Sequence, residues 1–123
     1  AHYYFRDFWF ADTGMLAAMH VLAALGGQDR PLSELGAEYE RYASSGEVNS
    51  TVADARAKVA EVRGAFPDAV VDELDGMTVK LADGAWFNLR ASNTEPLLRL
   101  NVEAADESAM SDLRDEVLAI IRA

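Results

Sequence analysis

A polar interruption between two apolar stretches is the strongest candidate in this chain for chemistry. Residues 90–96 read Arg-Ala-Ser-Asn-Thr-Glu-Pro, so one guanidinium, two hydroxyls and one amide fall within five residues. All these groups donate hydrogen bonds, and the planar fork of Arg90 suits the oxygens of a phosphate. The side chains of Ser92, Asn93 and Thr94, together with turn N–H groups, can bind the remaining oxygens. The pattern therefore predicts a phosphate-binding loop.

The same residue types also suit an ordinary solvated β-turn, because Ser, Asn and Pro favour turns whatever their function. Composition alone leaves both interpretations open. A nucleophilic role for Ser92 is disfavoured, since it needs a nearby base and the two histidines are His2 and His20, the second inside an expected helix. The acidic residues between 68 and 75 lack the spacing of a calcium loop. We therefore expect a solvated edge there and no metal site in this chain.

The charge balance excludes several classes of partner. Half of the residues are apolar and 26% are charged, which is typical of a folded globular core. The formal net charge is −10, and the 11 Lys and Arg residues are scattered, so nucleic acids and anionic membranes should be repelled. No apolar run approaches the roughly 20 residues that cross a bilayer, and the absence of cysteine suits a cytoplasmic location. An anionic ligand therefore requires a local pocket.

The loop should be positioned by an antiparallel sheet. Asp75-Gly76 and Asp83-Gly84 each separate apolar runs, and Asp-Gly favours tight hairpin turns because its residues tolerate positive φ. In the run that follows the loop, alternation places Leu98, Leu100 and Val102 on one face. The expected strands span residues 69–74, 77–81, 85–89 and 97–103.

Two helices should cover one face of this sheet. Residues 52–66 carry apolar side chains three or four positions apart, and Pro67 ends that pattern. A second stripe begins at about Asp106 and comprises Met110, Leu113, Val117 and Ile120 or Ile121. With a possible short strand at 47–50, the prediction for residues 46–123 is an α+β fold. Its sheet is four-stranded and mostly antiparallel, with two helices on one face.

The first third of the chain has a different pattern. Residues 2–10 form an aromatic run of strand-like composition, and Asp12 or Thr13 can cap a helix over 15–25. A shorter helix should follow Pro31, with an apolar stripe that reaches Tyr42. We place a linker at Ser44-Ser45-Gly46, so residues 1–45 form a partial α/β segment of one strand and helices. Such aromatic residues would be costly to expose on a free terminus, so we expect that a preceding segment has been cut away.

Two motifs in this chain resemble the same family. Residues 90–96 closely resemble the phosphate-binding loop in the last domain of the α-D-phosphohexomutases. Asn93 matches the phosphomannomutase/phosphoglucomutase branch, since the phosphoglucosamine mutases usually have Gly there. Ala1-His2, the aromatic residues that follow and Asp12-Thr13-Gly14 resemble the end of the domain 3 sugar loop, Gly-Glu-x-Ser-Gly-His, with Ala1 in place of Gly. The two matches cover essentially the whole chain.

The resemblance implies a domain organisation and an activity. Residues 1–45 would be the C-terminal remnant of domain 3, and residues 46–123 a complete, TBP-like domain 4. Family members are isomerases that interconvert hexose 1-phosphate and hexose 6-phosphate through hexose 1,6-bisphosphate. A phosphoserine donates the phosphoryl group with help from Mg²⁺ held by aspartates, and both loops belong to domains 1 and 2, which this chain lacks. Whether mannose or glucose phosphates are preferred does not follow.

The resemblance also assigns roles to individual residues. Arg90, Ser92, Asn93 and Thr94 would bind the phosphate that is not being transferred, and His2 would assist proton transfer near the reacting oxygen. For His2 the structural alternative is a strand-edge histidine ordered by its neighbours.

The expected partners are a hexose phosphate and the missing N-terminal domains, with self-association of the fragment as a further possibility. The fragment should be inactive alone. The competing hypothesis is a small α+β regulatory or protein-interaction module in which residues 90–96 form a plain turn.

Overall fold

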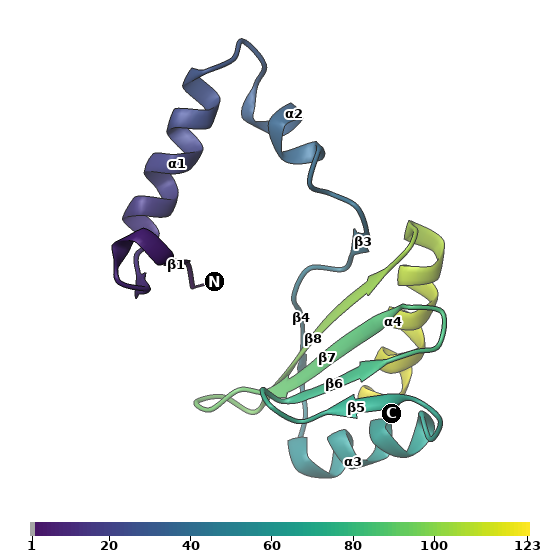
Figure 1. Ribbon diagram of the computed structural model, residues 1–123. Coiled ribbons are helices and arrows are strands. Elements are labelled where there is room, and N and C mark those ends of the chain that lie inside the picture. The colour runs from purple at the N-terminus through teal and green to yellow at the C-terminus, as the bar shows by residue number, and fades with distance from the viewer. Residues whose placement is uncertain (1) are drawn as a thin grey trace. The chain divides into compact units, whose positions relative to one another are not determined.

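The computed structural model describes residues 2–123, which divide into two compact units with the boundary between Glu40 and Arg41. Figure 1 shows the chain with its elements labelled. The first unit contains β1 (Tyr4–Phe5), a 3₁₀ turn (Arg6–Phe8), β2 (Ala11–Asp12), α1 (Gly14–Gly26) and α2 (Leu32–Ala37). The second contains β3 (Ala43–Ser44), β4 (Val48–Thr51), α3 (Ala55–Ala65), β5 (Val70–Asp72), β6 (Met77–Lys80), β7 (Trp86–Ala91), β8 (Leu97–Ala104) and α4 (Glu107–Ile121).

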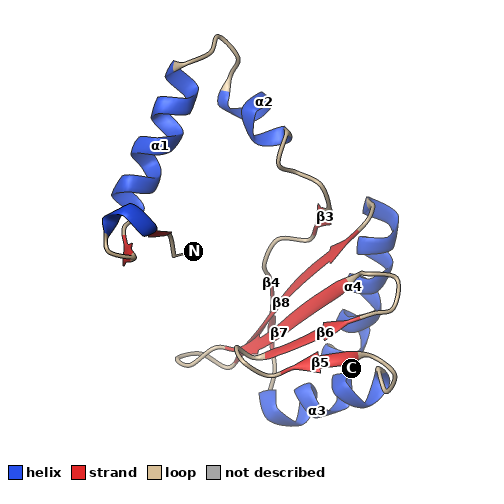
Figure 2. Ribbon diagram, in the orientation of Figure 1, coloured by secondary structure: helices blue, strands red, loops and turns tan. Residues whose placement is uncertain are grey.

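The second unit is built on one antiparallel sheet. Strands β5, β6, β7 and β8 are neighbours in chain order, and β4 and β3 both pair with the outer edge of β8. Helices α3 and α4 lie on one face of this sheet (Figure 2). The opposite face of the sheet is not covered by either helix, so its side chains are available to a ligand.

Alternation along the strands separates the core from the open face. On β8, Leu98, Leu100 and Val102 are buried toward the helices, whereas the residues between them are half-buried on the other side. Phe87 of β7 is fully buried and packs edge-on against Phe66 at the end of α3, with 5.1 Å between ring centroids. The helices complete the core with Val62, Met110, Leu113, Val117, Leu118 and Ile121. Burial of these apolar surfaces is the main stabilising contribution in this unit.

The predicted fold class is confirmed, but the sheet contains more than the four predicted strands. The segment interpreted as a linker is held to β8: the Ser45 N–H donates to the Val102 carbonyl, and the Val102 N–H donates to Ser45 Oγ, both at 2.9 Å. Gly46, with φ of +61°, then bends the chain into β4. Sequence propensity does not reveal these contacts because they depend on a partner 57 residues away.

The first unit differs from its prediction in two places. The aromatic run is not one strand but a short hairpin, in which Trp9 and Phe10 adopt φ of +53° and +55° to reverse the chain. Helix α2 ends at Ala37, so Tyr39 and Tyr42 lie beyond it, because Gly36 and β-branched or aromatic residues stabilise a helix poorly. Helix α1 follows the prediction, and its cap is Thr13, whose Oγ1 accepts the Leu16 N–H at 3.2 Å.

Burial separates the two units. None of residues 2–40 is classed as buried, and the exposed side chains include Tyr4, Trp9, Phe10 and Met15. The large core lies in residues 50–121. Within the described residues, no helix has both the length and the apolar character needed to cross a bilayer.

We expect Phe87→Ala to lower the free energy of unfolding of the second unit by about 3–5 kcal/mol, because it removes a fully buried ring and leaves a cavity. Urea denaturation followed by the NMR signals of β7 and β8 measures this change. The matched control is Leu74→Ala, since Leu74 is 93% exposed and should change stability by no more than about 0.5 kcal/mol. Equal losses in the two variants would contradict the assigned core.

We also expect amide hydrogen exchange to be faster throughout residues 2–43 than in residues 50–120, because backbone protection follows burial and packing. The exchange rates should be measured at a protein concentration at which the chain is monomeric. Equal protection of the two segments in the monomer would disprove this expectation.

Candidate functional site

The loop between β7 and β8 is organised by the hydroxyl of Ser92. Its Oγ accepts the N–H groups of Thr94 and Glu95 at 3.4 and 3.3 Å, and the Ser92 N–H donates to the Leu97 carbonyl at 2.8 Å. Two of the oxygen's acceptor positions are thus occupied by the loop itself, which leaves the hydroxyl proton to donate outward. A local side-chain bond of this kind shapes a turn and at the same time presents a donor.

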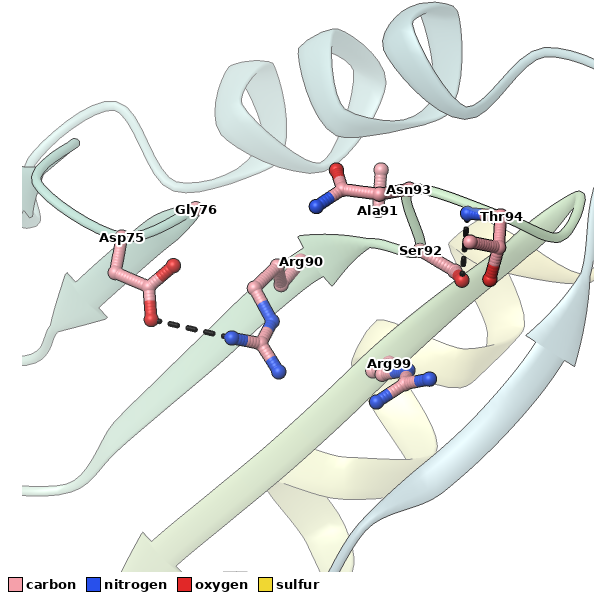
Figure 3. Close-up of a pocket in the computed structure, with 8 residues that line it drawn as sticks. All are labelled: Asp75, Gly76, Arg90, Ala91, Ser92, Asn93, Thr94 and Arg99. Atoms are coloured by element: carbon pink, nitrogen blue, oxygen red, sulfur yellow. Dashed lines mark hydrogen bonds and ion pairs between the residues drawn. The ribbon is translucent and has the colours of Figure 1, made fainter. Parts of the chain in front are cut away.

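A cavity of about 530 Å³ lies against this loop (Figure 3). Its volume is in the range of small-molecule sites. All four predicted phosphate-binding residues line it. In Figure 3 the hydroxyls of Ser92 and Thr94 lie side by side, whereas the amide of Asn93 points toward the Asp75-Gly76 turn. The complete lining is Asp75, Gly76, Arg90, Ala91, Ser92, Asn93, Thr94 and Arg99.

Two arginines meet at this cavity. Arg90 at the end of β7 is the direct cross-strand partner of Arg99 on β8, and both side chains lie on the open face of the sheet. Like charges opposite one another destabilise a pair of strands, so this arrangement has a cost that an anion between the guanidinium groups would offset. A positive site of this kind stands out in a chain whose net charge is −10.

Arg99 is the site residue that sequence reasoning left open between a source of positive potential and a plain surface residue. Its Nε is buried and has no hydrogen-bond partner within residues 2–123. A usable signal was present in the sequence, because Arg90 and Arg99 flank the loop symmetrically and hairpin partners lie at equal distances from the turn. The signal was weak because the residue at which pairing resumes depends on the loop conformation.

Carboxylates flank both arginines. Arg90 Nη1 donates to Asp75 Oδ2 at 3.2 Å, and an Arg99 nitrogen lies 3.8 Å from a Glu47 carboxylate oxygen. The Arg90 and Asp75 side chains are 45% and 77% exposed, so this ion pair contributes little to stability. The contact does not close the site, since the cavity extends from Asp75 past Arg90 to the loop.

His2 lies in the first unit, and its neighbours are described within that unit. Its Nδ1 contacts Asp12 Oδ2, while the Tyr3 N–H donates to Asp12 Oδ1 at 2.9 Å. A neutral imidazole that donates from Nδ1 carries its lone pair on Nε2, which is the form needed to accept a proton. Sequence reasoning treated Asp12 only as a possible helix cap. The hairpin that brings Asp12 back to His2 is the missing information, and Ala1 lies outside the described residues.

The hydrogen bond from His2, followed by the bond from the Tyr3 N–H, holds the pKa of Asp12 below its ordinary value of 3.8. Elsewhere the described residues offer no cation site: no three His, Cys, Asp or Glu side chains among residues 2–123 are grouped to hold a metal ion.

Comparisons with known proteins give the same assignment over both units. The family model described as phosphoglucomutase/phosphomannomutase, C-terminal domain, matches residues 47–120, and the model for alpha/beta/alpha domain III of the same family matches residues 1–42. The chain belongs to the phosphoglucomutase/phosphomannomutase family. The resemblance seen in the loop and in the opening residues is therefore confirmed at the level of the family.

Individual relatives extend over nearly the whole chain. A phosphomannomutase of Methanocaldococcus jannaschii is 39% identical over 120 residues, which cover 98% of this chain and 26% of the relative. A protein of Xanthomonas campestris named phosphohexose mutases is 40% identical and covers 97% of this chain and 27% of its own length. The crystal structure of a family protein from Burkholderia thailandensis aligns with a TM-score of 0.69 and 25% identity over 99% of this chain and 26% of that one. The chain thus spans about a quarter of these proteins.

The contact with His2 gives a prediction for the titration of Asp12. Its carboxyl should titrate below 3.8, and in His2→Ala the midpoint should rise toward 3.8, because the first cause of the shift is removed. A depressed folded pKa means that the stabilising contribution is present above the ordinary value and lost as the pH falls through the folded value. Side-chain carboxyl NMR measures both midpoints. Identical midpoints in the two proteins would show that the contact does not form.

Proposed function

We propose that this chain is the phosphosugar-binding part of a phosphomannomutase/phosphoglucomutase that interconverts hexose 1-phosphate and hexose 6-phosphate. Arg90, Ser92, Asn93 and Thr94 bind the phosphate that is not being transferred. The observation that carries the proposal is the cavity in which two guanidinium groups and two loop hydroxyls converge. Named relatives and the family match support the class of reaction.

The available donors match the demands of a phosphate dianion. Arg90 can present two parallel N–H groups, which is a strong and directional contact for two oxygens. The hydroxyls of Ser92 and Thr94 can reach the third oxygen, and Arg99 adds a second positive charge from the neighbouring strand. Binding energy obtained at this distant phosphate orients the sugar so that its other oxygen faces the phosphoryl donor.

His2 has a different role in the proposal. Its ring would exchange a proton with the reacting sugar oxygen, and Asp12 would keep the ring oriented. The exposed position of His2 suits a group that contacts a ligand.

The chemistry of transfer belongs, in this proposal, to other parts of the enzyme. A phosphoserine and a Mg²⁺ site, with hexose 1,6-bisphosphate as intermediate, are expected in the N-terminal domains. The described residues of this chain do not fit the metal, as no suitable group of ligands is present among them. We infer that the chain alone binds phosphosugar weakly and is inactive. Its functional partners are the remaining domains, and the exposed apolar side chains of residues 2–40 provide a surface for them or for a second copy. The cytoplasmic location stays a prediction.

Arg90→Ala should weaken phosphate binding by about tenfold or more, because a charge-assisted hydrogen bond contributes about 1.5–3 kcal/mol. Titration with inorganic phosphate or glucose 6-phosphate, followed by backbone amide shifts, measures the affinity. Arg90→Lys should fall between the two, since Lys supplies the charge without the planar fork. The matched control is Arg56→Ala, because Arg56 is exposed on α3 and does not line the cavity.

In the wild-type chain the shifts should be confined to residues 90–94 and Arg99. If millimolar phosphate moves no signal in the wild type, the proposal fails and an interaction module becomes the better interpretation.

A further inference from the structure

The guanidinium proposed to bind phosphate already has an anion beside it. Figure 3 shows Arg90 with Asp75 on one side and Arg99 on the other. The 3.2 Å contact engages Nη1 of Arg90, which is one of the donors that a bidentate phosphate would use. Asp75 also lines the cavity itself, so its carboxylate and a bound phosphate would occupy neighbouring positions.

Asp75 is held at this position by its backbone. The Asn88 Nδ2 group on β7 donates to the Asp75 carbonyl at 2.9 Å and to Thr78 Oγ1 at 3.0 Å. The next residue, Gly76, has φ of +69°, and a Cβ there would lie 2.8 Å from the Leu89 carbonyl oxygen. The turn is therefore packed against β7 as closely as the chain permits. The carboxylate is consequently presented to Arg90 by a fixed turn.

The Asp75 side chain, unlike its backbone, is weakly held. It is 77% exposed, and within residues 2–123 its carboxylate has Arg90 as its hydrogen-bonding partner. An ion pair this exposed is easily exchanged for a better one, and a phosphate dianion carries more charge and more acceptor positions than a carboxylate. The geometry thus combines a fixed location with a replaceable contact.

We propose that Asp75 is an internal competitor that occupies Arg90 in the absence of ligand and sets the phosphate affinity of the loop. The inference rests on the proposed function, because it concerns the same site. In that function one loop must bind either phosphate of a bisphosphorylated intermediate and release it again. A carboxylate that returns to Arg90 lowers the affinity and thereby favours release, at the cost of weaker binding.

Asp75→Asn tests the proposal. The amide keeps the size of the side chain and an acceptor oxygen but removes the charge. It should tighten the binding of inorganic phosphate to the full chain by about two- to fivefold, the range expected for an exposed ion pair. Asp75→Glu restores a carboxylate and should return the affinity toward the wild-type value. The measurement uses freshly prepared protein, because an Asn-Gly sequence deamidates to a carboxylate.

Two controls separate local competition from the general loss of a negative charge. Asp83→Asn removes one charge from the other Asp-Gly turn, whose residues do not line this cavity, and should leave the affinity unchanged. Glu47→Gln removes the carboxylate beside Arg99, and its effect should be smaller than that of Asp75→Asn because its contact is longer, 3.8 Å against 3.2 Å.

The direction of the change decides the outcome. If Asp75 merely holds Arg90 in place, Asp75→Asn will weaken phosphate binding or leave it unchanged, and either result overturns the inference. An equal gain in Asp83→Asn also overturns it. These failures are distinct from failure of the proposed function, which would appear in the wild type as a complete lack of phosphate binding.

Discussion

The pairing of β7 with β8 determines both the core of the second unit and its candidate site. In this register Phe87 lies opposite Val102 and Leu89 opposite Leu100, all four buried beneath the helices. The same register places the two arginines opposite each other on the uncovered face. Because side chains alternate with a period of two, a slip of one residue would bury a guanidinium and expose a core side chain. Apolar burial on one face thus stabilises an unfavourable charge pair on the other.

Local geometry also explains how an acidic chain can offer a site to an anion. At physiological ionic strength, exposed charges farther apart than about 8–10 Å are largely screened from one another. The many carboxylates elsewhere on the surface therefore matter less to a ligand than the arginines that contact it. The two nearby carboxylates, Asp75 and Glu47, matter most, and each lies next to one arginine. Net charge describes the encounter with large polyanions, whereas binding of a small anion depends on the first contacts.

Sequence patterns predicted those features that depend on neighbouring residues. The Asp-Gly turns and the alternation at Leu98, Leu100 and Val102 located the meander, and the loop composition located the four lining residues of the cavity. Features that depend on distant pairing were not predicted. The contact of Ser45 with Val102, the partnership of Arg90 with Arg99 and the return of Asp12 to His2 each require a register that residue types do not encode alone.

The order of the strands has a consequence for how copies of this chain meet one another. Along most of its length the outer edge of β8 is already paired, with β4 next to Leu97–Leu100 and β3 next to Glu103 and Ala104. The opposite edge of the sheet is β5, which offers only three residues. Acidic residues stand in and beside this edge at Asp68, Asp72 and Glu73. Short, negatively charged edges resist the addition of a foreign strand, so the sheet can leave one broad face open to solvent without inviting fibrous stacking.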